Sequence, residues 1–359
     1  MKFNKNKGIT LIALVITIII LLILAGISIS TLTQTGLFGK AKQAEQKSKE
    51  AEQNQATTLG SYEKEINKYV AEELTSDKLD KLLSATENTV LKDSKGNIFT
   101  VPAGFKVTND ATTVDKGIVI EDATGTATNG SQFVWVQVGT IEKEDGTNTP
   151  INLNRYTFNS NGNETVQDEK IVETYYSETT SGKGNTVATS ITDFKTSVAT
   201  NGGYYIGRYE ARKNTKSGKL TEVKTDIVWN SITQPNAAKQ ARNMYDNTYP
   251  FASDLMNSYA WDTAILFIQN CTSTKYSRQK PVSSSFYSTG TKDEKCNIYD
   301  MASNVKEWTT ETSSYSGNPC VRRGGVYDYS GSYTSSRYYY STSYNHATVG
   351  YRPVLYLNV

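Results

Sequence analysis

The first thirty residues contain the feature that most constrains this chain. Residues 9–30 read ITLIALVITIIILLILAGISIS without a charge, and they follow a leader with three lysines and no acid. A helix of this length would be roughly 33 Å long, enough to cross a hydrocarbon layer of about 30 Å. The run is also longer than the roughly 7–15 apolar residues of a secretory signal peptide. The sequence therefore predicts a transmembrane helix over 9–30, with the lysines on the cytoplasmic side.

The start of this run resembles the processing site of type IV prepilins. Residues 7–12 read KGITLI, and in that family a membrane peptidase cuts after the glycine. The resemblance implies cleavage after Gly8, a leader of residues 1–8, and a methylated Ile9 as the new N-terminus. It also implies that a pilin-like helix over 9–58 packs against other pilin subunits. Ala13 stands where the family commonly has Glu, which favours a minor or tip subunit; the alternative is an uncleaved membrane anchor that never polymerises.

The residues after the apolar run predict a helical connector and then a second domain. Residues 40–54 are rich in helix formers and poor in large apolar groups, which indicates a solvated helix. Apolar residues then recur at three- and four-residue steps from Leu59 to Val70, so we expect an amphipathic connector over 59–95. From residue 96 onward short β-like runs alternate with turn residues. The clearest are 97–102, 117–120, 133–138 and 204–208.

Composition excludes several classes of function. The chain has 38 Lys and Arg against 36 Asp and Glu, a balance unlike that of a nucleic-acid-binding protein. His346 is the single histidine, so no site with two imidazoles can form, and we expect it to be a surface or contact residue. Cys271, Cys296 and Cys320 are too few for a disulfide-rich scaffold. One pair could be oxidised outside the cell, and the sequence leaves open which.

Four short motifs occur in order along the second domain, at 133–136 (FVWV), 203–210 (GYYIGRYE), 297–309 (NIYDMASNVKEWT) and 323–325 (RGG) followed by 350–353 (GYRP). Together they resemble the formylglycine-generating, sulfatase-modifying family, a branch of the C-type-lectin-like fold. The resemblance implies an irregular domain with long ordered loops over 96–359. The expected fold class is therefore α+β: a long N-terminal transmembrane or pilin helix followed by this lectin-like domain.

The enzyme activity of that family is not expected here. It needs two cysteines after the Arg-Gly-Gly motif to bind copper, and residues 326–359 contain none. We therefore expect no enzyme, and a formylglycine-type oxidase is only a remote alternative. Relatives can bind calcium in the segment that contains Asn304 and Glu307, so calcium is the one cofactor that the resemblance allows. Ser303 and Lys306 depart from the family's residues there.

The segment 326–346 has the composition of a binding surface. Seven tyrosines and six serines fill 13 of the twenty positions from 326 to 345. Tyrosine gives large, rigid contact area, and serine gives adaptable hydrogen bonds. The alternative is an exposed hairpin with a few buried tyrosines. The predicted contact residues are Tyr327, Asp328, Tyr329, Ser330, Ser332, Tyr333, Ser335, Tyr338, Tyr339, Tyr340, Tyr344 and Asn345.

This segment also resembles the variable region of the target proteins of diversity-generating retroelements. In those systems adenine-directed mutagenesis yields Tyr, Ser, Asp, Asn and His on a lectin-like scaffold. The resemblance implies a nearby template repeat and a reverse transcriptase gene. The sequence thus predicts a type IV pilin-like adhesin, inserted in the membrane as a precursor and then displayed on the cell surface or pilus. Its expected partners are pilin subunits, the prepilin peptidase, the membrane, and an extracellular protein or glycan, and no nucleic acid.

Overall fold

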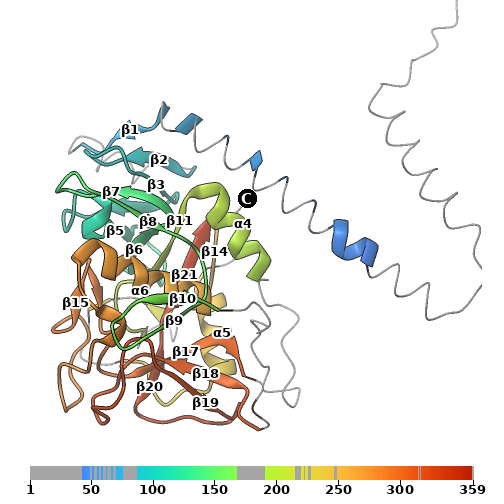
Figure 1. Ribbon diagram of the computed structural model, residues 1–359, viewed down its shortest axis with the longest axis vertical. Helices are drawn as coiled ribbons and strands as arrows, with labels where there is room; N and C mark the ends of the chain where they lie inside the picture. The colour runs from blue at the N-terminus through green and yellow to red at the C-terminus, as the bar shows by residue number, and fades with distance from the viewer. Residues whose placement is uncertain are drawn as a thin grey trace, which may run out of the picture. The chain divides into compact units, whose positions relative to one another are not determined.

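The chain divides into two compact units, Met1–Gln55 and Ala56–Val359. The computed structural model describes residues 43–48, 51, 55, 58, 59, 62, 66, 67, 70–75, 87–167, 191–214, 220, 221, 223, 224, 228–245, 249–313, 315 and 317–357. In the first unit the described residues are helical and exposed. The strands belong to the second unit, which is drawn with its labels in Figure 1.

The predicted fold class is wrong in its helical part. Among the described residues no helix is both long and apolar enough for a membrane span. The longest helix among the described residues, α6 (Ser258–Thr272), has 15 residues, and most of the regular secondary structure is β-sheet with short helices. The reason is that apolar residues beyond residue 87 occur in runs of three to six between turns, which is the length of strands. The predicted span 9–30 and the cleavage site at Gly8 and Ile9 lie outside the described residues.

The predicted helical connector over 59–95 is partly a sheet. Strands β1 (Glu72–Glu73) and β2 (Thr89–Lys92) lie within it, and they pair with each other in parallel. Strand β3 (Ile98–Val101) then pairs with β2 in antiparallel orientation. The described part of the preceding helix leaves its apolar side chains exposed. These are Leu59, Tyr62, Ile66 and Val70.

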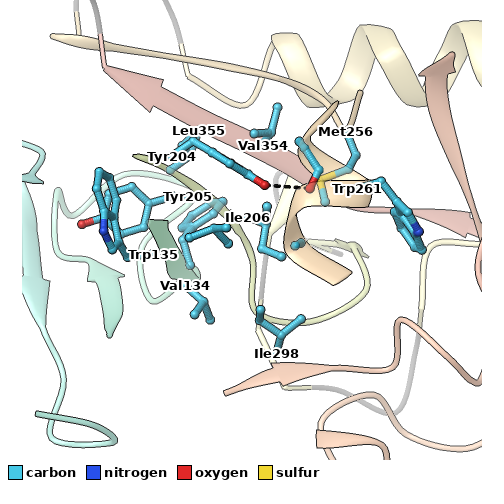
Figure 2. Packing of buried hydrophobic residues seen from close by; sticks show 14 of the residues in the cluster. Val134, Trp135, Tyr204, Tyr205, Ile206, Met256, Trp261, Ile298, Val354 and Leu355 are labelled. Atoms are coloured by element: carbon cyan, nitrogen blue, oxygen red, sulfur yellow. Dashed lines mark hydrogen bonds between the residues drawn. The ribbon is translucent and has the colours of Figure 1, made fainter. Parts of the chain in front are cut away.

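A six-stranded antiparallel sheet forms the centre of the second unit. It contains the predicted runs 117–120, 133–138 and 204–208 and confirms them as strands. Their near-continuous apolar sequences are typical of strands buried on both faces, and the side chains of this sheet fill the core in Figure 2. The order across the sheet is β14 (Phe251–Leu255), β21 (Pro353–Leu357), β11 (Gly203–Gly207), β6 (Gln132–Gln137), β5 (Val119–Asp122) and β4 (Phe105–Val107).

Three short α-helices lie among the described residues beyond residue 190, and α6 is the most deeply buried. Its first turn is capped by Asn257, whose side-chain oxygen accepts a hydrogen bond from the amide of Ala260 at 2.8 Å. The hydroxyl of Tyr204 donates to the carbonyl of Ala260 at 2.7 Å and so ties α6 to the central sheet (Figure 2). The other two helices are α4 (Ile191–Asn201) and α5 (Gln234–Arg242).

Short hairpins and turns complete the unit around these elements. The two-stranded sheets pair β7 (Gly139–Glu142) with β8 (Asn148–Ile151), β9 (Tyr156–Phe158) with β10 (Glu164–Val166), β12 (Arg212–Lys213) with β13 (Leu220–Thr221), and β15 (Glu294–Lys295) with β16 (Ile298–Tyr299). Two 3-10 turns are η2 (Val114–Lys116) and η3 (Tyr276–Arg278).

The last sheet carries the Tyr/Ser segment. Its order is β19 (Arg337–Tyr340), β18 (Cys320–Arg323), β17 (Lys306–Thr312) and β20 (Val349–Tyr351). These four strands lie together at the lower end of the unit in Figure 1. β18 is antiparallel to both neighbours, whereas β17 and β20 are parallel. The sheet thus joins the motif at 297–309, the Arg-Gly-Gly motif and the Tyr/Ser segment.

Candidate functional site: a tyrosine surface over two buried cations

The register of the four-stranded sheet decides which side chains share a face. Trp308 on β17 lies opposite Arg322 on β18, and Arg322 lies opposite Tyr338 on β19. Because side chains alternate along a strand, Lys306 and Tyr340 belong to the same face as these three. The intervening residues project from the other face.

The other face is held by five charged side chains, four of them buried and Arg337 partly buried, which we call the arginine–carboxylate network. Glu311 accepts from Arg155 at 2.9 Å, from Arg323 at 3.1 Å and from Arg337 at 2.9 Å. Asp262 on α6 contacts Arg323 and Arg337. Burial raises the pKa of Glu311, but the three arginines outweigh it and hold that pKa below its usual value. Arg337, although it belongs to the Tyr/Ser segment, is therefore a structural residue.

The glycines of the Arg-Gly-Gly motif allow the strand end to approach the loop before β17. Gly324 has φ +87°, and a Cβ there would lie 2.7 Å from the carbonyl oxygen of Met301. A Cβ on Gly325 would lie 1.7 Å from the carbonyl oxygen of Ala302. Any larger residue would therefore displace β18 from this loop. The motif fixes the base on which the Tyr/Ser segment rests.

Four tyrosine rings surround two cations on the face of the sheet that carries Arg322 and Tyr338. We call Lys306, Arg322, Tyr329, Tyr338, Tyr340 and Tyr344 the tyrosine–cation cluster. The Arg322 guanidinium carbon lies 4.1 Å from the Tyr340 ring centroid and 5.1 Å from that of Tyr344. The ammonium of Lys306 lies 4.5 Å from the ring centroid of Tyr338. The guanidinium carbon of Arg322 lies 5.9 Å from the same centroid. Cations over aromatic faces are attracted by the ring quadrupole, so the rings and the cations hold one another in place.

Both cations are buried, with side-chain nitrogens that find no hydrogen-bond partner in the described part of the chain. Lys306 is 2% and Arg322 is 6% exposed. Among the described residues, nothing forms a hydrogen bond with the Lys306 Nζ or with the Nε and Nη1 of Arg322. Burial, together with the nearby charge of Arg322, lowers the pKa of Lys306 to about 7. Asp328 acts in the opposite direction but does not restore the usual value.

A second contact of the same kind lies at Tyr333. The guanidinium carbon of Arg278 is 3.8 Å from the Tyr333 ring centroid, and the ammonium of Lys280 is 5.9 Å from it. Tyr333 is half-buried, and its backbone amide donates to the hydroxyl of Ser336 at 2.9 Å. Cations thus accompany the tyrosines at two places in the segment.

The structure separates the predicted contact residues into different environments. Tyr339 projects from the opposite side of β19 to Tyr338 and packs on the exposed Tyr315 ring at 5.1 Å. Ser332 is fully buried and is a structural residue, because its hydroxyl accepts from the amide of Val326 and donates to the carbonyl of Tyr329. The exposed or half-exposed predicted residues are Tyr327, Asp328, Tyr329, Ser330, Tyr333, Ser335, Tyr338, Tyr339, Tyr340, Tyr344 and Asn345.

His346, expected to be a contact or surface residue, is exposed at the end of this segment. Its Nδ1 lies 2.8 Å from the hydroxyl of Thr348, and its ring stacks near Tyr344 at 6.3 Å. No carboxylate contact of this ring appears among the described residues. The arrangement is that of a surface side chain beside the tyrosine–cation cluster.

Sequence reasoning missed Lys306, Arg322, Arg278 and Tyr315. Lys306 lies 20 residues before the Tyr/Ser segment and was noted only as a departure from a family motif. Arg322 lies beside the Arg-Gly-Gly motif, and alternation along β18 could have separated it from Arg323. Finding that both cations face Tyr338 needs the register between β17, β18 and β19.

The two residues considered for calcium are engaged elsewhere. Both carboxylate oxygens of Glu307 accept from Arg352, at 2.6 and 2.7 Å. The Asn304 amide donates to the carboxylate of Glu210, whose pKa is raised by burial and by the nearby Asp300 and Glu307 charges. No group of three or more His, Cys, Asp or Glu side chains suited to a metal ion occurs in the described part of the chain. These contacts do not fit a calcium site.

The three cysteines are free thiols. Cys296 and Cys320 are buried, and Cys271 is partly buried. Burial raises the pKa of Cys271 and of Cys320 to about 12, so both are protonated at neutral pH. Cys320 lies on the strand that carries Arg322, where its sulfur is 3.8 Å from the side-chain oxygen of Gln234.

Comparison with known proteins finds similarity among solved structures. No protein-family model and no curated protein matches the chain. It is similar to CarF, at 14% identity and a TM-score of 0.33 over 63% of this chain and 98% of that one. It is similar to variable protein 1 of Treponema denticola, at 13% identity and a TM-score of 0.33 over 70% and 98%. The I1 variant of the Major Tropism Determinant is 11% identical, with a TM-score of 0.34 over 77% and 83%. Likeness at this level assigns neither fold nor function to this chain.

Proposed function

We propose that the second unit is a ligand-binding domain of the C-type-lectin-like kind, displayed outside the cell, that recognises an extracellular protein and has no enzymatic role. The observation that supports this is the tyrosine–cation cluster on one face of the four-stranded sheet. Tyr329 is 53% exposed, and the other three tyrosine rings are half-buried, so they present aromatic area that is already ordered. Ordered tyrosines bind at little cost in conformational entropy.

The surface has the layout of a binding site with a firm base. The arginine–carboxylate network fixes Arg337 at the start of β19, and the indole of Trp261 donates to the carbonyl of Thr334 at 3.1 Å. These contacts hold the segment from below, so we expect its exposed residues outside the tyrosine–cation cluster to tolerate substitution with little loss of stability. That separation supports the proposal that the segment is a diversified binding region, as its resemblance to retroelement targets implies.

Replacing Tyr329 and Tyr338 by Ala is expected to weaken binding strongly and to destabilise the fold by no more than about 2 kcal/mol, the size of the lost cation–π contacts. Central aromatic residues of an interface contribute about 2 kcal/mol or more each, so each substitution should reduce affinity by roughly 30-fold. The full-length protein would be screened on an array of extracellular proteins and glycans, and the variants would be titrated against the protein ligands found. The control is Tyr62→Ala, which removes an exposed ring outside the Tyr/Ser segment. Loss of the melting transition in the double variant would show that these rings belong to the core. Unchanged binding by a folded double variant would show that they are not the binding surface.

We also propose that the protein is a minor or tip subunit of a type IV pilin-like filament. The support is the sequence at 7–12, with its basic leader and Gly8 before Ile9. The proposed partners are other pilin subunits and the prepilin peptidase, in the membrane and then on the cell surface. The alternative is a membrane-anchored binding protein that does not polymerise.

Mass spectrometry of the protein purified from its own cells distinguishes the two. We expect a mature N-terminus at Ile9 carrying one added methyl group, because the peptidase of that family cuts and methylates at this position. A variant with Gly8→Ala should retain residues 1–8. An intact leader in the unaltered protein would contradict the pilin proposal and favour the anchor.

A further inference from the structure

We propose that Lys306 and Arg322 form a subsite for the carboxylate of an acidic side chain of the ligand, reached beside the ring of Tyr338. This inference rests on the proposed function and names the chemistry that the surface recognises. Its basis is a pair of buried cations that form no ion pair with any residue that the structure describes. Lys306 and Arg322 are more than nine-tenths buried and point at the same tyrosine ring.

Arginines near these two cations show what a compensated charge looks like in this sheet. Arg323 and Arg337 each contact both Asp262 and Glu311, and Arg352 forms two hydrogen bonds with Glu307. Arg322 is the remaining arginine of the region 320–357. Among the described residues, no carboxylate lies within ion-pair distance of Arg322 or Lys306. The fold therefore supplies anions to three arginines and leaves one arginine and one lysine facing the tyrosine surface.

A buried cation without an anion costs free energy, and tyrosine rings compensate only part of that cost. Proteins retain energetic costs of this kind at functional sites, where binding of the ligand offsets the cost. A carboxylate that accepts hydrogen bonds from both Lys306 and Arg322 would do so, because charge-assisted bonds are among the strongest in proteins. Asp328 is the single acidic residue between 313 and 357, and its exposed side chain does not fill this role.

The observations favour a protein ligand over a charged glycan. The two cations lie together beneath the half-buried Tyr338, so the subsite suits one inserted anionic group and not a row of charges along a polymer. The surrounding surface is tyrosine and serine, the composition with which antibody loops recognise proteins. Side-chain rotation at an interface is common on binding, so we expect the Tyr338 ring to change its rotamer when an anion binds.

The test is titration calorimetry of the full-length protein with a hexaglutamate peptide, its hexaglutamine counterpart and an oligogalacturonate. We expect heat with hexaglutamate and none with hexaglutamine. Lys306→Met and Arg322→Gln should each weaken hexaglutamate binding by about 10- to 100-fold, since each removes one charge-assisted contact. The control is Lys195→Met, which removes a lysine at the same 4.5 Å from a tyrosine ring, that of Tyr259 on α6. Melting curves of all variants confirm that they are folded.

Three results would overturn the subsite: no binding of hexaglutamate, equal binding by every variant, or tighter binding of oligogalacturonate. The experiments test the proposed function independently of the subsite. If a protein ligand from the array requires Tyr329 but binds Lys306→Met as well as the unaltered protein, the function stands and the subsite falls. If hexaglutamate binding requires Lys306 but the array ligand binds the Tyr329 and Tyr338 variants as well as the unaltered protein, the subsite stands and the tyrosine surface is not the interface.

Discussion

Replacing Glu311 by Gln should destabilise the second unit by about 3–5 kcal/mol, because it removes one of the two negative charges from a network that contains three arginines. Glu311 lies between three arginines, and Asp262 is a second carboxylate that pairs with Arg323 and Arg337. The substitution preserves the shape of the side chain. It leaves Arg323 and Arg337 paired with Asp262 alone, and it removes the carboxylate that pairs with the buried Arg155.

Urea unfolding of the full-length variant measures this loss. The matched control is Glu121→Gln, which breaks a partly exposed ion pair with Lys106 at 2.9 Å and should cost less than about 1 kcal/mol. Equal effects of the two substitutions would mean that water enters the network and screens its charges. In that case the Tyr/Ser segment would not be anchored by Arg337 as the contacts indicate.

The strands of the central sheet could be predicted from the sequence, whereas their assembly could not. The runs at 133–138 and 204–208 are apolar at nearly every position, and both proved to be strands buried on both faces. The signals for α5 and α6 are weaker, since α6 is buried along almost all of its length and shows no polar stripe. The predicted helical connector became partly β because Thr89–Lys92 pairs with the residues on either side of it.

The binding segment was predicted from composition, but its organisation depends on register. Composition treats the seven tyrosines alike, whereas alternation along β19 places Tyr338 and Tyr339 on opposite faces. Lys306 and Arg322 are 16 positions apart in the sequence. They meet only because β17 turns back as β18, with a register shift between Trp308 and Thr312. No periodicity in the sequence contains that information.

Lys306→Met should stabilise the second unit even though we expect it to weaken binding. The reference pKa of a lysine is 10.5, and that of Lys306 is about 7 in the folded protein. One pKa unit corresponds to about 1.4 kcal/mol, so the folded protein loses at most about 5 kcal/mol by holding this charge at low pH. Methionine fills a similar volume without a charge. Part of the gain is offset by the lost attraction to the Tyr338 ring, so we expect about 1–5 kcal/mol at pH 6.

The pH dependence of this gain identifies its cause. Below pH 7 the lysine is protonated in both the folded and the unfolded chain, and the cost of the buried charge is complete. Between pH 7 and about 10.5 the folded protein releases the proton while the unfolded chain keeps it, so the unaltered protein becomes relatively more stable as pH rises. The charged and titratable groups that face Lys306 are Arg322, Asp328, Tyr329 and Tyr338.

Urea unfolding of both proteins at pH 6 and pH 9 therefore separates two explanations of any stabilisation. If the buried charge is the cause, the advantage of the variant should shrink by about 2–3 kcal/mol over that interval, because the lysine of the unaltered protein has by then lost its proton. An advantage that is the same at both pH values would come from better packing of methionine. It would mean that Lys306 is not held at an energetic cost, and the argument for an anionic partner would lose its basis.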